Sequence, residues 1–433
     1  MIEIIESKEA LAALKLTLKE RGNMDTGEAA QTAKEIVRRV KNEGDAALFE
    51  YTRKFDCPDM DASKVKVSLE EMKAAFENLS PDLQKAMKLS ASRIEAFHEK
   101  QKQNTWIDVK ENGEILGQRV MPLEKAGVYV PGGKAAYPSS VLMNVIPAKV
   151  AGVEKIVMTT PANKEGKLSQ EVLAAAYIAG VTDVYKVGGA QAIAALAFGT
   201  ESIPKVDKIV GPGNIYVALA KREVFGYVSI DSIAGPSEIL VVADSSANPT
   251  FLAADLLSQA EHDQLASSIL ITPDKSLAEK VQKEVAHFYE IMPRQAILKE
   301  SLTNYSKIII VEDLKAACDL ANEIAPEHLE LAVAAPFEVM TQIKNAGAIF
   351  LGHYTPEPVG DYMAGPNHVL PTNGTARFFS PLGVDDFVKK SSILSFTREA
   401  LLPIGEDIVK FAKSEDLHAH ALSVQVRLDE EAK

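Results

Sequence analysis

Apolar residues recur three and four positions apart through the N-terminal part of the chain, and this period predicts amphipathic helices. The clearest examples are residues 32–41, 45–55 and 69–76. The charged stretch at 93–102 fits the solvated face of another helix. We therefore expect residues 1–125 to form a helical segment that packs on a larger domain of the chain.

The pattern changes near residue 126, where short runs rich in valine and isoleucine begin to alternate with alanine-rich helical stretches. The expected strands cover residues 128–130, 155–158, 184–187 and 208–210. The expected helices cover residues 140–150, 170–179 and 191–198, with a fourth from Asn214. Strands and helices that alternate at this spacing predict right-handed βαβ units and a parallel sheet.

A second series of the same kind follows. Its expected strands cover residues 239–242, 268–271, 308–311, 329–333 and 348–351. Its expected helices cover residues 250–262, 276–289 and 313–324. The fold class is therefore α/β, with a first domain at 126–237 and a second at 238–382, on which we expect the N-terminal segment to pack.

The segment 353–383 contains several Pro and Gly residues and no sustained period of either kind. A long irregular connection in a compact domain is usually a functional loop. The tail at 383–433 predicts a strand at 393–396 and helices at 399–413 and near 415–426.

Composition narrows the class of protein. Of 433 residues, 46% are apolar and 25% are charged, which is ordinary for a globular chain. Sixty acidic and 47 basic side chains leave a net charge of -13, so we expect no nucleic acid and no anionic membrane as partner. No apolar run approaches the ~18 residues of a membrane span, and the acidic N-terminus does not resemble a signal peptide.

The two cysteines, Cys57 and Cys318, lie far apart in the sequence. One disulfide is arithmetically possible, but the composition fits a reducing compartment, and we expect a cytoplasmic protein. Neither cysteine has the basic neighbours of a nucleophile, and Cys318 falls on an apolar helical stripe, which predicts a core residue.

Seven of the eight histidines lie at or after position 262, which favours a shared site in the C-terminal half. Gln259 and His262 are three positions apart, so on a helix they face the same side and can reach one metal ion. Glutamine is an unusual zinc ligand, and from spacing alone a polar helix face is the better interpretation.

Glu327 and His328 stand where a proline-terminated helix meets a strand. An adjacent carboxylate and imidazole can divide proton-transfer work, one activating water and the other serving a hydroxyl group. A capping or turn pair explains the same two residues equally well.

The long loop and the tail hold the remaining candidates. Asp361 offers a carboxylate oxygen of the kind that zinc accepts, and His368 follows on the same glycine-rich backbone. From this evidence alone, an Asx-type turn is the better interpretation. In the tail, His418 and His420 are two positions apart, so on a helix at most one of them should join a site.

Glycine motifs follow several expected strands, at 132–133, 188–191 and 211–214. They indicate a ligand at the carboxyl ends of the strands, although simple turns explain them too. No G-x-G-x-x-G occurs, so the standard dinucleotide fingerprint is absent.

The string Ile230-Asp231-Ser232-Ile233-Ala234-Gly235-Pro236-Ser237-Glu238 resembles the signature region of histidinol dehydrogenases. The motifs at 258–262, 325–329, 360–362 and 365–368 match the same family in the same order, as do the glycine motifs. The resemblance runs essentially from end to end, and several motifs in register make it specific.

The resemblance implies oxidation of L-histidinol to L-histidine with two NAD⁺, the last step of histidine biosynthesis. It implies one zinc ion per subunit and a homodimer of chains with two incomplete Rossmann-like domains. It places the zinc ligands at Gln259, His262, Asp361 and His420, and the proton-transfer pair at Glu327 and His328.

The resemblance also assigns the ligand contacts. Those to the nucleotide fall on Tyr129, Gln191 and Asn214. Those to the substrate fall on the metal ligands and on Ser237, His328, His368 and Glu415. The tail carries His418 as an extra histidine beside the expected metal ligand, His420. The resemblance implies that the tail crosses to the other subunit of the homodimer.

Two other classes of function use the same residues. A zinc hydrolase would use the same ligands with Glu327 as the base for water, without NAD⁺. A non-enzymatic metal-binding protein could also consist of two α/β lobes. Formation of NADH from histidinol separates the first alternative from a dehydrogenase, and the lack of a signal peptide counts against the second.

Overall fold

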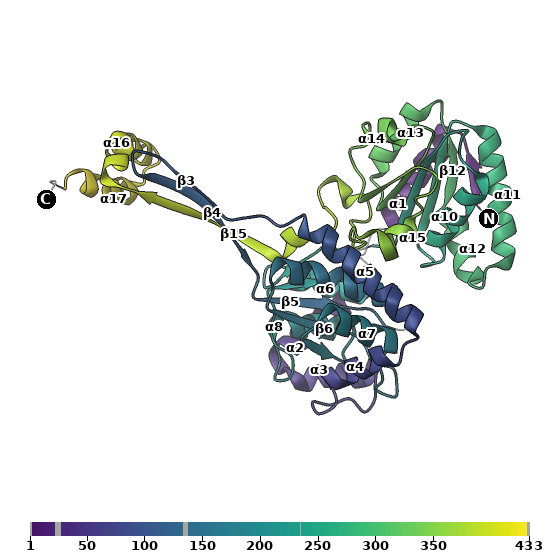
Figure 1. The fold of residues 1–433 in the computed structure, drawn as a ribbon, viewed down its shortest axis with the longest axis horizontal. Helices are drawn as coiled ribbons and strands as arrows, with labels where there is room; N and C mark the ends of the chain where they lie inside the picture. The colour runs from purple at the N-terminus through teal and green to yellow at the C-terminus, as the bar shows by residue number, and fades with distance from the viewer. Residues whose placement is uncertain (1, 22–26, 133–136, 234, 431–433) are drawn as a thin grey trace. The chain divides into compact units, whose positions relative to one another are not determined.

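A computed structural model of the chain describes residues 2–21, 27–132, 137–233 and 235–430. The chain divides into two compact units, which we call unit 1 (Met1–Gln101 and Leu123–Phe387) and unit 2 (Lys102–Pro122 and Val388–Lys433). Figure 1 follows the course of the chain through both units. Gly133 and Ala234, which belong to two of the sequence motifs, lie outside the described residues.

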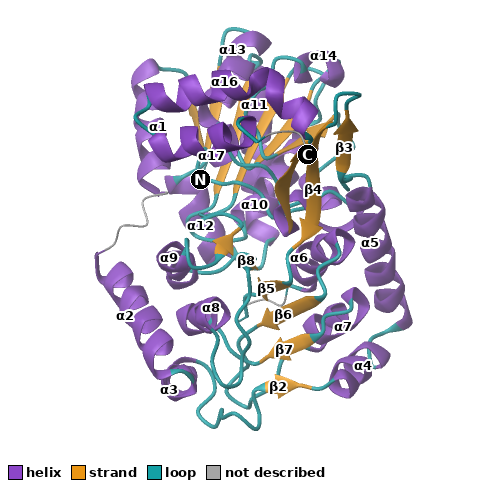
Figure 2. Ribbon diagram, turned by 90° about the vertical axis from the view of Figure 1, so that its left-hand side faces the viewer, coloured by secondary structure: helices purple, strands orange, loops and turns teal. Residues whose placement is uncertain are grey.

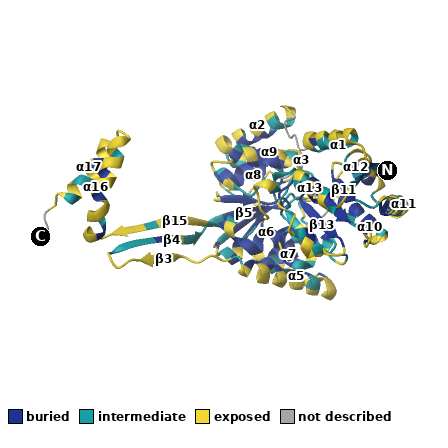
Figure 3. Ribbon diagram, turned by 90° about the horizontal axis from the view of Figure 1, so that it is seen from above, coloured by how far each residue is buried: buried dark blue, intermediate teal, exposed yellow. Residues whose placement is uncertain are grey.

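Unit 1 contains two six-stranded sheets. The first has the order β2-β7-β6-β5-β8-β9, parallel except for β2 at its edge (Figure 2). Its strands are β2 (Lys66–Val67), β5 (Lys125–Tyr129), β6 (Lys155–Thr159), β7 (Asp183–Tyr185), β8 (Lys208–Val210) and β9 (Ser229–Ile230). The central strands are buried, as expected for a parallel sheet covered on both faces (Figure 3).

Helices cover both faces of this sheet. Its helices are α2 (Gly27–Glu43), α3 (Asp45–Phe55), α4 (Leu69–Glu77), α5 (Pro81–Glu99), α6 (Pro138–Ala151), α7 (Gln170–Ala179), α8 (Gly189–Phe198) and α9 (Ile215–Val224). The helices α2, α3, α8 and α9 share one hydrophobic core with strands β5–β8. The helices α4 and α5 pack against α7 and α6, respectively.

The second sheet is parallel throughout, in the order β1-β12-β11-β10-β13-β14. Its strands are β1 (Glu3–Ile5), β10 (Glu238–Ala243), β11 (Ser267–Thr272), β12 (Lys307–Ile310), β13 (His328–Ala332) and β14 (Ala348–Leu351). Every residue of β10 and β11 is buried, which explains why the middle of each strand is a run of apolar residues without alternation.

The helices of the second sheet form two cores. One lies under α10 (Pro249–Ala260), α11 (Lys275–Ile291) and α12 (Gln295–Asn304). The other lies under α1 (Lys8–Arg21), α13 (Leu314–Ile324) and α14 (Pro336–Met340). Together the two sheets confirm the predicted α/β fold class.

Polar caps explain where many of these helices begin. Asn214, Asn248 and Asp313 accept hydrogen bonds from the first backbone N–H groups of α9, α10 and α13. At its other end α13 stops at Ala325, whose φ of 53° places a non-glycine residue in the left-handed region. The proline that follows cannot extend the helix, so the chain turns into β13 there.

The N-terminal segment differs from the expectation that it packs on the second domain as a unit. Only β1 and α1 join the second sheet, where β1 pairs with β12. The helices α2 and α3 bury their apolar faces against the first sheet instead. Residues 102–122 are not helical and belong to unit 2. Helical periodicity locates an apolar face but does not identify the surface that covers it.

The segment 353–383, expected to be an irregular loop, contains short helical turns. They are α15 (Glu357–Val359), the π-helical turn η1 (Gly360–Ala364) and the 3₁₀ turn η2 (Thr375–Arg377). Helix α5 holds η1, since Ser90 Oγ donates to the Tyr362 carbonyl at 2.6 Å and Arg93 donates to the Met363 carbonyl. The Asn367 amide donates to the Met143 carbonyl in α6 at 2.6 Å. The loop of the second domain is thus fixed to helices of the first.

Unit 2 combines an antiparallel sheet with the C-terminal helices. Its strands β3 (Trp106–Val109), β4 (Glu114–Pro122) and β15 (Val388–Phe396) pair in the order β15-β4-β3, and the helices are α16 (Arg398–Ser414) and α17 (His418–Leu428). The tail therefore does not stand alone, because β3 and β4 come from residues that the sequence places in the N-terminal segment. Short η3 (Val384–Phe387) precedes β15 and belongs to unit 1.

None of the helices among residues 2–21, 27–132, 137–233 and 235–430 combines the length and apolarity that crossing a bilayer requires. Both cysteines are buried and unpaired, and Cys318 lies in the core shared by α1, α13 and the second sheet, as its apolar stripe predicts.

Candidate active site

Glu327 and His328 are both held by the backbone of one residue, Glu238, in the neighbouring strand. The Glu238 N–H donates to Glu327 Oε2 at 2.9 Å. The His328 ring lies with Nδ1 2.9 Å from the Glu238 carbonyl oxygen. A carbonyl only accepts, so Nδ1 carries the proton and Nε2 of the neutral ring is free to act as an acceptor.

Burial controls the charge of this pair. Burial raises the pKa of Glu327 well above its ordinary value, and the nearby carboxyl of Glu238 raises it further. Burial lowers the pKa of His328 to about 4, so its imidazole is neutral near pH 7. The 3.7 Å approach of the two side chains is therefore not a salt bridge of charged groups. A neutral imidazole with a free Nε2 and a carboxyl poised to ionise suit proton transfer.

Asp361 lies beside His328 on the π-helical turn η1. His328, Glu357 and Asp361 each offer a ligand atom, and these atoms lie within 4.8 Å of one another. Asp361 Oδ1 is also 3.3 Å from His368 Nδ1. Burial by itself would raise the pKa of Asp361, but the hydrogen bond and charge of His368 hold it well below its ordinary value. Asp361 is thus an anionic carboxylate near pH 7, the form in which a carboxylate can bind zinc.

Glu357 is a residue of this cluster that the sequence did not single out. Its Oε1 lies 3.6 Å from His328 Nε2 and has no hydrogen-bond partner, and its side chain is buried. Burial, followed by the charge of Asp361, raises the pKa of Glu357 to about 10. It is therefore a neutral acid near pH 7 when no cation lies beside it. Only its place in a proline- and glycine-rich segment next to Asp361 could have drawn attention to it.

Gln259 is fully buried near the end of α10, yet neither its amide oxygen nor its amide nitrogen has a hydrogen-bond partner among the described residues. Buried polar atoms without partners cost free energy, so this amide is suited to contact a bound ligand or ion. The polar helix face that spacing alone favours does not describe a buried amide.

His262 lies just past the end of α10, in the turn that follows Glu261 rather than on the helix. Its N–H donates to the Gln259 carbonyl at 3.2 Å, which keeps the two residues together. His262 is exposed in the single chain. The protein around its ring nevertheless lowers the pKa of His262 by desolvation, while the charge of Asp361 raises it. Gln259 and His262 therefore belong to the same region of the molecule as Asp361.

All of these groups lie at the amino ends of the strands of the second sheet, because β10 begins at Glu238 and β13 begins at His328. Ser237 immediately precedes β10 and accepts a backbone hydrogen bond from Ser267. Open α/β sheets usually bind ligands at the carboxyl ends of strands, so this edge could not be predicted from the fold class.

Tyr129, Gln191 and Asn214 line one cavity of about 810 Å³ in the first domain. Tyr129 is the last residue of β5, and Gln191 and Asn214 follow β7 and β8, so this cavity lies at the carboxyl edge of the first sheet, as the glycine motifs predict. The N-termini of α8 and α9 are there too, and their N–H groups suit phosphate. Gly211 is required at this edge, because its φ is 111° and a Cβ would lie 2.1 Å from the Tyr129 carbonyl oxygen.

The side chains in this cavity are tied to one another. The Gly189 N–H donates to the Tyr129 hydroxyl at 3.2 Å, and burial raises the pKa of Tyr129 to about 12. The Gln191 amide donates to Asp56 Oδ2 at 3.3 Å. Asp56 comes from the end of α3 and was not predicted, since nothing in the sequence links it to the first sheet. The Asn214 side chain accepts hydrogen bonds from the first turn of α9, so it stabilises this helix whether or not it also contacts a ligand.

Glu415 and His420 lie in unit 2, on the two sides of the turn between α16 and α17. Asp416 has a φ of 55°, which marks the bend between the helices. Glu415 and His420 are exposed in the single chain, as is His418 at the start of α17. The bend brings the ends of the two helices together, as a joint role for Glu415 and His420 requires.

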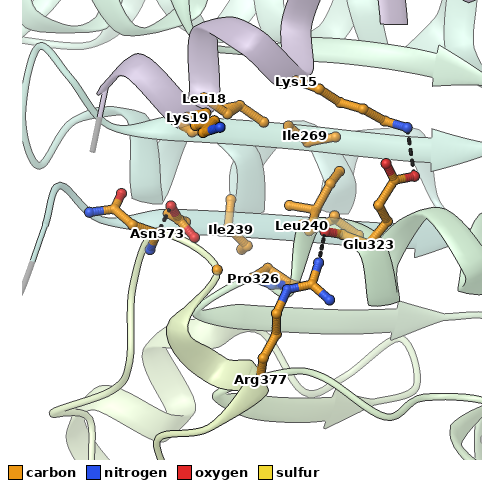
Figure 4. Close-up of a pocket in the computed structure, with 14 residues that line it drawn as sticks. Lys15, Leu18, Lys19, Ile239, Leu240, Ile269, Glu323, Pro326, Asn373 and Arg377 are labelled. Carbon is orange, nitrogen blue, oxygen red and sulfur yellow. Dashed lines mark hydrogen bonds and ion pairs between the residues drawn. The ribbon is translucent and has the colours of Figure 1, made fainter. Parts of the chain in front are cut away.

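A second cavity, of about 320 Å³, lies between α1 and the strands β10 and β11 (Figure 4). Lys15 pairs with Glu323 across it at 2.6 Å. None of the site residues predicted from the sequence lines this cavity. Its wall includes Glu238, so it lies on the other side of the residue that holds Glu327 and His328.

Comparison with known proteins identifies relatives over nearly the whole chain. The model of the family described as histidinol dehydrogenase matches residues 19–428. The histidinol dehydrogenase of Caldanaerobacter subterraneus subsp. tengcongensis is 56% identical over 428 residues, covering 99% of each chain. That of Bacillus cereus is 55% identical over 432 residues, covering 99% of this chain and 100% of the relative.

Among solved structures, the crystal structure of histidinol dehydrogenase from Elizabethkingia anophelis is similar with a TM-score of 0.88. It is 41% identical in sequence, and the match covers 92% of each chain.

Proposed function

The chain belongs to the histidinol dehydrogenase family, and on that premise we propose how its residues carry out the reaction. It is an NAD-dependent dehydrogenase that oxidises histidinol in histidine biosynthesis. The product is L-histidine, reached through the bound aldehyde with two NAD⁺. The observation that carries the assignment of the proton-transfer pair is the Glu238 backbone, which fixes both Glu327 and His328.

His328 acts as the base that removes a proton from the substrate in both oxidations. Its Nδ1–H is engaged by the Glu238 carbonyl, so only Nε2 can take up a proton. Nε2 has no hydrogen-bond partner among the described residues, and the ring is neutral. A proton accepted there makes the ring a cation, which the carboxylate of Asp361 stabilises.

Glu327 acts as the base for water in the second half of the reaction. Conversion of an aldehyde to an acid consumes water, whereas oxidation of the alcohol does not. A carboxyl whose pKa is raised by burial is a stronger base once ionised. The Glu238 N–H leaves one of the two carboxyl oxygens free to reach water.

Gln259, His262 and Asp361 would hold zinc, with His420 as the fourth ligand. The buried amide without partners, the adjacent imidazole and the anionic carboxylate fit the ligand types of this metal. Bound zinc would orient the nitrogen atoms of the substrate, so that its alcohol carbon faces the nicotinamide. The alternative set of His328, Glu357 and Asp361 is less suitable, because Glu357 is a neutral acid and His328 is needed as a base.

The remaining assignments follow the two sheets. The cavity around Tyr129, Gln191 and Asn214 would bind NAD⁺, and its volume of about 810 Å³ is large enough for part of a dinucleotide. Ser237, His368 and Glu415 would bind the substrate, together with His328 and the metal ligands. The first α/β domain (126–237) would therefore serve the nucleotide, and the second (238–382) the metal and the proton transfers.

We also propose a homodimer that works in the cytoplasm. Among its described residues, unit 2 buries only the apolar side chains of Ala400, Val409 and Ala421, which is a small core for its size. It exposes large apolar side chains on β3, β15, α16 and α17, among them Trp106, Leu394, Phe411 and Leu422. A second copy of the chain would cover them and would bring its Glu415 and His420 to the site. The two buried free thiols are consistent with a reducing compartment.

One experiment tests the function and the metal together. Purified protein is assayed for metal content, and NADH is counted against histidine formed from histidinol. We expect two NADH per histidine and one zinc per chain, and activity that chelation abolishes and zinc restores. One NADH per turnover, with the aldehyde as final product, would contradict the two-step proposal.

A further inference from the structure

The main chain at Glu238 determines where the two proton-transfer groups lie. Its N–H holds Glu327 and its carbonyl holds His328, each at 2.9 Å. A shift of this one residue would therefore move both groups at once.

The side chain of Glu238 is itself fixed by Arg21. Arg21 Nη2 donates to Glu238 Oε1, and the Asn373 N–H donates to the same oxygen at 3.1 Å. Arg21 Nη1 donates to the Leu265 carbonyl at 2.8 Å and lies 3.4 Å from the Ser237 carbonyl. The Arg21 side chain is completely buried, with 0% of its surface exposed. The guanidinium thus joins the segment before β10 to the segment before β11.

Arg21 is far from the site in sequence. It is the last residue of α1, which joins the second sheet through β1 and covers one of its faces. A buried ion pair usually stabilises a fold no more than well-packed apolar side chains of the same size do. Stability alone therefore does not account for an arginine here, whereas its contacts with the backbone around Glu238 do.

We propose that Arg21 is a positioning residue for histidinol oxidation, which acts through Glu238 on the placement of Glu327 and His328. This inference rests on the proposed roles of Glu327 and His328. Arg21 touches neither substrate nor nucleotide in this account. Its loss should therefore slow the chemical steps and leave substrate binding and metal content largely unchanged.

The test compares Arg21→Met with Arg21→Lys and with Lys19→Met, a matched change two residues earlier on the same helix. Misplacement of catalytic groups by about 1 Å can cost on the order of 100-fold in rate. We expect Arg21→Met to lower kcat about 10- to 100-fold, with KM for histidinol and NAD⁺ changed less than about threefold. Arg21→Lys should retain part of kcat, and Lys19→Met all of it. Folded Arg21→Met protein with kcat within about twofold of the parent would overturn the proposal.

If Arg21→Met does not fold, Glu238→Gln decides. It preserves the shape of the side chain and the backbone groups but removes the charge that Arg21 holds. We expect the same fall in kcat at nearly constant KM, and an unchanged kcat would reject the proposal.

Chemical rescue separates positioning from folding. Glu238 lines the cavity of Figure 4, so a small guanidinium ion has a route to its carboxylate. Guanidinium should restore part of kcat to Arg21→Ala but none to Glu327→Gln. A failure to rescue folded Arg21→Ala would argue against positioning by this ion pair.

A double variant distinguishes failure of this inference from failure of the proposed function. With Glu327→Gln already present, Arg21→Met should slow aldehyde oxidation much less than it does in the parent chain. Equal effects in both backgrounds would show that Arg21 does not act through Glu327. If Glu327→Gln and His328→Asn are themselves fully active, the proposed function fails; if only Arg21→Met is active, the positioning role alone fails.

Discussion

Glu327 and His328 are adjacent in sequence, and the structure leaves both uncharged near pH 7 but with different proton-transfer capacities. His328 is a neutral base with one free nitrogen, and Glu327 is a carboxyl whose ionisation burial opposes. Neither property follows from the sequence, because both depend on burial by segments that are remote along the chain.

The division of labour predicts different effects of two substitutions. Glu327→Gln should slow oxidation of the aldehyde at least about 100-fold and affect oxidation of the alcohol much less, because only the second half consumes water. His328→Asn should slow both halves. Single-turnover formation of NADH from histidinol and from histidinaldehyde measures each half. A wild-type aldehyde step in Glu327→Gln would show that another group activates water.

Asp56 predicts a pH dependence of stability in the absence of ligand. Burial raises its folded-state pKa to about 6, above that of the unfolded chain, so the folded state binds this proton more tightly. The stability that the protonated Asp56 contributes is fully present below about pH 4. It is lost as the pH rises through about 6, and the free energy of unfolding falls by up to about 3 kcal/mol. Denaturant unfolding at pH 4 and pH 7 measures this difference.

The matched variants isolate this contribution. Asp56→Asn should lose the fall between pH 4 and pH 7, whereas Asn in place of the exposed Asp108 should keep it. The same fall in Asp56→Asn as in the parent chain would assign the pH dependence to other groups.

A substitution of Cys318 tests the prediction that this thiol is a core residue and not a nucleophile. It is completely buried in the core under α13, and burial raises the pKa of its thiol, the opposite of what a nucleophile needs. Cys318→Ala should cost about 1 kcal/mol of stability and leave kcat unchanged. Loss of turnover in folded Cys318→Ala, measured with histidinaldehyde, would show that this thiol takes part in oxidation of the aldehyde.

At the scale of elements, the π-helical turn η1 sets the position of Asp361. The ring of Phe350 from β14 packs against Gly360, so that a Cβ there would lie 2.7 Å from the ring. The turn is also tied to α5 through Ser90 and Arg93. Single π-helical turns occur frequently at functional sites.

Gly360→Ala should therefore displace Asp361 without removing any ligand. We expect zinc affinity to fall about 10-fold or more, with a parallel loss of activity that excess zinc partly restores. Gly27→Ala is the control, since a Cβ there meets nothing within 4 Å. Unchanged zinc affinity in Gly360→Ala, measured by competition with a chelator, would show that η1 tolerates the shift.

These elements also show which parts of the fold and of the candidate site can be predicted from the sequence. The strands and helices of both α/β domains were predictable, because buried parallel strands and capped amphipathic helices leave a local pattern at positions such as Asn214 and Asp313. The destinations of α2 and β4 were not predictable, since apolar periodicity does not name a partner surface. Glu357 and Asp56 were missed for a related reason: their chemistry arises from burial against remote segments.

At the scale of the whole molecule, the candidate sites of the two domains lie at opposite edges of their sheets. The cavity around Gln191 lies at the carboxyl edge of the first sheet, and Glu327 and His328 lie at the amino edge of the second. The loop that carries Asp361 and Asn367 is fixed to α5 and α6, so it joins the proposed metal site to the domain that we propose binds the nucleotide.

The central claim is that the proposed zinc and substrate site is complete only when a second copy of the chain contributes His420 and Glu415 from its unit 2. The most direct measurement mixes two inactive chains, one with His262→Ala and the other with His420→Ala, and assays the purified heterodimer. With shared sites, one site carries both lesions and the other carries none, so activity should return to about half of the wild-type value per heterodimer. With each site confined to a single chain, every site keeps one lesion, and a heterodimer without activity would contradict the account.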